Sequence, residues 1–197
     1  MLILGHAGIT VGAALVGEAV LGHRNAPTSL SRPLEVIQDI TVSLSQRIDL
    51  RVLFVASLLP DIIDKPLGLV LFAPAFGSGR LFAHTLWFPL ALLAAGLMLR
   101  SFRGGQVLLV FAFGSGMHLL LDAMWLTPAT LFWPLLGPFP QGNNPDQWLE
   151  TIIRALLTNP GAYVPEIAGA ILLLPLLTIV MGSKSLLRFL RTGSLIA

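Results

Sequence analysis

Two ionisable side chains interrupt a long apolar stretch of the chain. His118 and Asp122 lie in the run 107–126, which is otherwise almost wholly apolar. Because an ionisable group costs free energy in hydrocarbon, such residues in a membrane segment indicate a functional site by default. Residues spaced i, i+4 share one helix face, with Cβ atoms about 5–6 Å apart. The pair can therefore offer an imidazole nitrogen and a carboxylate oxygen to one metal ion.

Further His and Asp residues could complete such a site: His6, Asp61, Asp64 and His84. The chain has no cysteine, so thiolate metal sites are excluded and the ligands are imidazole and carboxylate. This set suits zinc best, and manganese or iron are the alternatives. Six ligands exceed the need of one catalytic zinc with an open position. We therefore expect two metals, or one metal with carboxylates that support its ligands.

Arg80 and Lys65 would add positive charge to this site. Two divalent ions already outweigh three carboxylates in charge, so a site of this composition attracts a phosphate ester and stabilises charge that develops on it. We expect Arg80 and Lys65 to act in catalysis. Two alternatives remain at this stage, since either residue could be an interface anchor and a single intramembrane histidine could serve packing or proton transfer.

The composition predicts an integral membrane protein. Of its 197 residues, 55% are hydrophobic and 11% are charged, whereas a soluble domain has about 25% charged residues. Mean hydropathy is +0.82. A membrane span needs about 20 mostly apolar residues, and the sequence offers five candidates, which predict an all-α polytopic bundle in a single domain, 1–197: residues 2–21, 50–72, 81–99, 107–126 and 167–181.

The second candidate span is interrupted by "PDIIDKP" at 60–66. Prolines and aspartates at this point leave open whether the segment crosses the membrane or re-enters it, and re-entrant backbone needs cover from protein or water. Two connections predict amphipathic helices on the membrane interfaces, at 31–48 and 144–157. The first begins with Ser31 as an N-cap and has an apolar stripe that includes Ile37 and Leu44.

Basic residues fall unevenly on the two sides of this arrangement. The connections on one side carry nine Lys and Arg residues and those on the other carry three. Cytoplasmic loops are enriched in Lys and Arg, so the N-terminus is predicted outside and the C-terminus in the cytoplasm. The six His and Asp candidates then share one depth in the outer half of the membrane. The net charge of +2 is scattered, so no nucleic-acid partner is expected.

Five segments appear in a fixed order along the chain: "HAGITVGAAL", "SLLPDIIDKP", "RLFAHTLWF", "HLLLDAMW" and "LFWPL". Through them the chain resembles the YdjM-like family of LexA-binding, inner-membrane-associated, metal-dependent hydrolases. That family is similar to the superfamily of zinc-dependent phospholipases C and single-strand nucleases. The resemblance implies that the following residues are metal ligands: His6, Asp61, Asp64, His84, His118 and Asp122.

The chain departs from the family pattern at one point. The family often has Asp-x-Asp-His after the proline, whereas here the aspartates lie one residue further apart and Lys65 follows them. The role of Asp64 is therefore open. We expect a membrane hydrolase that cleaves a phosphoester of a lipid or lipid-linked substrate with a metal-activated water. The alternatives are a transporter of metal ions or protons, and a non-catalytic adaptor for a cytoplasmic regulator.

Overall fold

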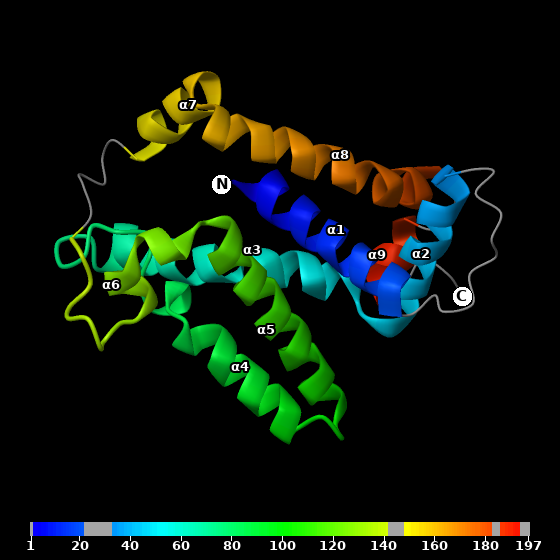
Figure 1. The fold of residues 1–197 in the computed structure, drawn as a ribbon, viewed down its shortest axis with the longest axis horizontal. Coiled ribbons are helices and arrows are strands. Elements are labelled where there is room, and N and C mark those ends of the chain that lie inside the picture. Colours follow the sequence, from blue (N-terminus) through cyan, green and yellow to red (C-terminus); the bar gives the residue numbers. More distant parts are fainter. Residues whose placement is uncertain (1, 22–32, 142–147, 183–185, 194–197) are drawn as a thin grey trace.

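The fold is all-α, as the sequence predicts, in a computed structural model that describes residues 2–21, 33–141, 148–182 and 186–193 (Figure 1). No strand occurs among these residues. Three short helices, η1 (Leu67–Leu71), η2 (Phe82–His84) and η3 (Met124–Leu126), join the longer ones. The α-helices are α1 (Ile3–Leu21), α2 (Pro33–Arg47), α3 (Leu50–Pro66), α4 (Trp87–Met98), α5 (Arg103–Leu121), α6 (Pro128–Leu131), α7 (Trp148–Thr158), α8 (Pro160–Gly182) and α9 (Leu186–Thr192).

Three helices in the described part of the chain are long and apolar enough to cross a membrane, in place of the five expected. They are Ile3–Leu21 in α1, Gly104–Leu121 in α5 and Pro160–Met181 in α8. Helix α3 carries too much charge over its 17 residues, and α4 has only 12 residues. The expected span 81–99 is not one continuous helix, because its first residues form η2 and a turn. Helix α4 therefore begins only at Trp87.

Helix α1 is the centre of the bundle and packs against both α8 and α3 (Figure 1). Its contact with α8 depends on glycine, because a Cβ atom at Gly8 would lie 2.0 Å from the carbonyl oxygen of Gly169. Small residues at such crossings let two backbones approach closely. Gly5 also faces Pro165 and Glu166, while Gly12 faces Leu172. The two helices therefore run in the same direction, and both begin at the same end of the bundle.

Helix α5 packs against α3 and, through a hairpin, against α4. A Cβ atom at Gly114 would lie 2.5 Å from the Cβ of Ala56, so a second glycine contact fixes the α3–α5 crossing. In Figure 1 the α4–α5 hairpin projects away from the α1–α8 pair. Helices α3 and α5 both end where α1 and α8 begin, and this end of the bundle collects the ionisable side chains.

Both expected amphipathic segments are helical where the structure describes them. Helix α2 buries Thr41, Leu44 and Ser45 against the bundle, and it packs on α1 and α8. Its neighbour Glu18 in α1 accepts a hydrogen bond from Ser43 Oγ at 2.6 Å and pairs with Arg47 at 3.0 Å. The second segment corresponds to α7. Ser31 and residues 144–147 lie outside the described residues, and the interfacial position of both helices stays a prediction.

Candidate metal centre

The candidate site forms where four elements meet: the start of α1, the end of α3, η2 and the end of α5. These elements bring the side chains of His6, Asp61, His84, His118 and Asp122 together in two overlapping groups. All three histidine side chains are 0% exposed. Segments that are distant in sequence thus place imidazoles and carboxylates in one buried cluster, as the topology argument predicts.

The first group consists of Asp61, His84 and His118. The Nε2 atoms of the two histidines are 3.3 Å apart. Asp61 Oδ1 lies 3.6 Å from His84 Nε2 and 3.8 Å from His118 Nε2. Three potential ligand atoms therefore form a small triangle.

Hydrogen bonds on the far side of each ring fix which nitrogen faces this triangle. His84 Nδ1 lies 2.8 Å from Asp64 Oδ2, and His118 Nδ1 lies 2.7 Å from the backbone oxygen of Ser57. A carboxylate and a carbonyl only accept hydrogen bonds, so both Nδ1 atoms carry a proton. In the neutral rings both Nε2 atoms then present lone pairs to each other, an arrangement that a cation between them stabilises.

The triangle fits a divalent metal. Two ligands of a tetrahedral zinc at 2.0–2.1 Å are about 3.3–3.4 Å apart, which agrees with the separation of the two Nε2 atoms and is slightly shorter than the distances to Asp61. Metal-bound histidines commonly donate the other ring N–H to a carboxylate or a backbone carbonyl, and His84 and His118 show one case of each. Two imidazoles and one carboxylate also leave a coordination position open for water or substrate.

Asp64 lies behind His84 and outside both groups. Its carboxylate is 0% exposed. It accepts hydrogen bonds from the backbone N–H groups of Leu81, Ala83 and His84, at 2.7, 3.0 and 3.1 Å, besides the His84 ring. Four donors engage its two oxygens, so the structure gives Asp64 the task of holding the 81–84 turn and the His84 ring. This finding answers the question that the unusual aspartate spacing raised.

The second group joins His6 and Asp122 to His118. His6 Nε2 lies 3.1 Å from Asp122 Oδ1, and the His6 ring stacks on the His118 ring with centroids 3.9 Å apart. Among the described residues, His6 Nδ1 has no hydrogen-bond partner, and Asp122 is the contact of Nε2. An imidazole and a carboxylate that face each other in this way could both bind one cation. The single Nε2 lone pair of His118 can bind only one ion, which leaves His6 and Asp122 as the ligands proper to this group.

A basic side chain accompanies the carboxylate of each group. Lys65 Nζ lies 2.5 Å from Asp61 Oδ2, and Arg80 donates to Asp122 Oδ2 at 2.9 Å. Each carboxylate thus directs one oxygen towards the imidazoles and the other towards a cation. The Arg80 side chain is 43% exposed. Both basic residues named from the sequence therefore lie at the border of the cluster, where an incoming anion would meet them.

One residue that supports this site was not among those predicted from the sequence. Glu166 in α8 accepts hydrogen bonds from the backbone N–H groups of Leu2, Leu4 and Gly5, at 2.6, 2.9 and 3.1 Å. It therefore satisfies the first turn of α1, next to His6. An acidic residue beside an apolar run could have indicated its role. The predicted span began at residue 167, however, and so did not include Glu166.

A protein-family model described as "YdjM inner membrane protein" matches residues 1–188. This range contains all six candidate ligands and both basic residues of the site. No curated protein and no solved structure matches the chain. The family description names a membrane and no reaction.

Proposed function

The chain belongs to the YdjM inner membrane protein family, and on that premise we propose that it is a multi-pass, metal-dependent hydrolase. The metal site is the basis of this proposal, and the observation that carries it is the pair of facing Nε2 atoms of His84 and His118, 3.3 Å apart. Asp61, His84 and His118 would hold the ion, with His6 and Asp122 beside them. The donor set suits zinc best, and manganese or iron are the alternatives.

A bound divalent ion would supply Lewis acidity and a lowered pKa for a water molecule. The side chains of the protein would position the metal and the substrate. Asp64 and the carbonyl of Ser57 keep the two imidazoles in the tautomer whose Nε2 is available. Arg80 and Lys65 would bind and orient the anionic group of the substrate and stabilise charge that develops during cleavage. Two cations at the border of a metal site favour a phosphoester as the substrate class.

The surroundings of the site support a lipid or lipid-linked substrate. Apolar side chains next to the ligands are exposed, including Phe82, Trp125 and Leu126. Phe82 precedes His84 by two residues, and Trp125 follows Asp122 by three. The candidate spans in α1 and α5 begin and end beside the cluster. A head group at the membrane interface could therefore reach the metal without leaving the bilayer.

The directions of the helices support an outward-facing site. Helices α1 and α8 start at the cluster, whereas α3 and α5 end there, so the chain alternates in direction as the loop-charge bias requires. Three spans, like five, place the two termini on opposite sides. A reporter fused after Ala197 should be cytoplasmic and a tag inserted in 140–146 should be external. If both lie on the same side of the membrane, the predicted outward orientation of the site is wrong.

A transporter of metal ions or protons is the second candidate. Thr10 and Ser115 favour it, because among the described residues their buried hydroxyl oxygens have no hydrogen-bond partner. They lie one helical turn from His6 and His118, on the side away from the membrane face at which the cluster lies. The next ionisable group on α1 is Glu18, which is already engaged by Ser43 and Arg47. The apolar residues between Thr10 and Glu18, with Val11 fully packed in the core, interrupt such a pathway.

Hydrolysis is tested with zinc-loaded protein in lipid and a panel of phospholipids, isoprenoid phosphates and simple phosphoesters. Arg80→Ala should lower kcat/KM while bound metal stays at the wild-type level, and Arg154→Ala, an exposed arginine on α7, is the control. Absence of hydrolysis by the loaded wild-type protein would overturn the enzyme proposal. Metal-dependent ion flux in proteoliposomes would then establish transport in its place.

A further inference from the structure

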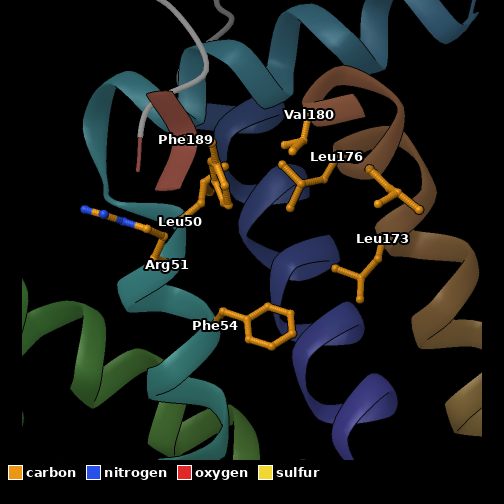
Figure 2. A pocket seen from close by; sticks show the side chains of 8 residues that line it. Leu50, Arg51, Phe54, Leu173, Leu176, Val180 and Phe189 are labelled. Atoms are coloured by element: carbon orange, nitrogen blue, oxygen red, sulfur yellow. The ribbon is translucent and has the colours of Figure 1, made fainter. Parts of the chain in front are cut away.

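Figure 2 shows an apolar groove between helices of the bundle. It lies at the end opposite to the His/Asp cluster. Leu50 lines it at the start of α3, about 16 Å along that helix from Asp61 at 1.5 Å per residue. The cavity has a volume of about 350 Å³. Its lining comes from α3, α8 and α9: Leu50, Arg51, Phe54, Leu173, Leu176, Leu177, Val180 and Phe189.

The groove results from the packing of two helices on a third. Helices α3 and α8 both contact α1, and Figure 2 shows α1 behind the space between their side chains. Phe189 of α9 lies at one end of this space. Seven of the eight lining residues are apolar, and Arg51 is the exception. Such a lining offers water no hydrogen-bond partners, so the occupant that fits is apolar.

Basic residues outnumber acidic ones in the sequence of the α3 and α9 segments at one end of the groove. Residues 49–51 and 186–191 contain three arginines and one acidic residue, Asp49. The Arg51 guanidinium points away from the apolar lining in Figure 2. It donates to Asp49 and, at 2.7 Å, to the backbone oxygen of Leu190, which fastens α9 to α3. Helix α9 follows the end of the candidate span Pro160–Met181. Arginines at the end of a span lie at the depth of the lipid head groups.

We propose that this groove binds one acyl chain of an anionic phospholipid, with the head group at the arginines of α3 and α9. The apolar lining selects a hydrocarbon chain, and the excess of arginine selects a negative head group over a zwitterionic one. The bound lipid would hold α3, α8 and α9 together, since all three contribute to the lining. This site is separate from the proposed hydrolase site, and it does not depend on metal or on catalysis.

The test uses the full chain, stripped of lipid in detergent and then supplied with phosphatidylglycerol or phosphatidylcholine of the same acyl chains. Phosphatidylglycerol should raise Tm by about 3–6 °C at ten times its Kd, and native mass spectrometry should detect one retained lipid. Phosphatidylcholine should have little effect. The Tm shift and the lipid adduct should both be lost in Leu177→Trp, which fills the groove.

Leu174→Trp is the matched control, because Leu174 is 51% exposed and Leu177 is 49% exposed, both on α8, but only Leu177 lines the groove. Arg191→Gln should weaken the response to phosphatidylglycerol, and Arg154→Gln on α7 should leave it unchanged. Equal responses to both lipids would overturn the head-group selection. Equal behaviour of the two tryptophan variants, or a dimer that forms in place of a lipid adduct, would overturn the groove as a lipid site.

Discussion

The Asp61–His84–His118 group and the His6–Asp122 pair lie side by side but are held in different ways. In the first group, each imidazole is fixed from behind, His84 by Asp64 and His118 by the carbonyl of Ser57. In the second, Nδ1 of His6 has no such partner among the described residues, and the ring is positioned by Asp122 at Nε2, by stacking on His118 and by the placement of α1. That placement comes from Glu166 and from the glycine contact with α8.

The cluster is therefore not a uniform set of ligands. Rings fixed by hydrogen bonds lose little freedom when a metal binds, so the first group is preorganised and should bind the tighter ion. The second group follows the position of one helix, and any change that moves α1 should weaken it first.

The largest effect is expected from removal of a ligand in the first group. His84→Ala should lower zinc affinity well beyond the about 10–100-fold that marks the loss of an orienting partner, because a ligand and one side of the triangle disappear. His6→Ala should remove at most a second, weaker ion and leave the tight one bound. Isothermal titration of metal-free protein with zinc measures both. Equal losses in the two variants would show that the groups form a single site.

Replacing Asp64 should have an intermediate effect. Asp64→Asn keeps the size of the side chain but removes its charge and turns one acceptor oxygen into a donor, so the 81–84 turn and the His84 ring lose their alignment. Zinc affinity should fall about 10–100-fold with unchanged stoichiometry. Asp39→Asn, on the exposed side of α2, is the control. If stoichiometry falls in Asp64→Asn as it does in His84→Ala, Asp64 is a ligand.

The smallest effect on the tight ion is expected from a change at the helix crossing. Gly8→Ala places a Cβ against the Gly169 carbonyl, so α1 must shift at an overpacking cost of about 1–3 kcal/mol. Gly17→Ala is the matched control on the same helix, since nothing lies within 4 Å of its Cβ. Unfolding in detergent micelles should show the loss only in Gly8→Ala. Tight zinc binding should persist in both variants, and its loss in Gly8→Ala would contradict the independence of the first group.

Much of the site could be predicted from the sequence because helix direction constrains depth. Once loop charges orient the chain, His6 at the start of one span and His118 near the end of another must lie at the same end of the bundle. The role of Asp64 could not be predicted, since spacing places it beside Asp61 but does not reveal that a turn of η2 folds its backbone N–H groups onto the carboxylate.

For a related reason, the sequence predicted five spans where three helices of the described residues are long and apolar enough to cross a membrane. Hydropathy counts apolar residues whatever their backbone conformation, so the stretch 81–99 qualified although its first residues carry the turn that positions His84. Residues 81–86 form the turn that carries His84, and α4 is shorter than a membrane span as a result. Glu166 was missed because the last span was drawn from the residue after it, whereas α8 begins at Pro160.

The His/Asp cluster is proposed to bind a divalent transition metal. The most direct test of this proposal is elemental analysis of detergent-purified protein, isolated without chelator through a tag that contains no histidine. The wild-type protein should contain at least one zinc, manganese or iron ion per chain, and His118→Ala should contain almost none. Wild-type protein without stoichiometric transition metal, even after dialysis against zinc, would contradict metal binding by the cluster.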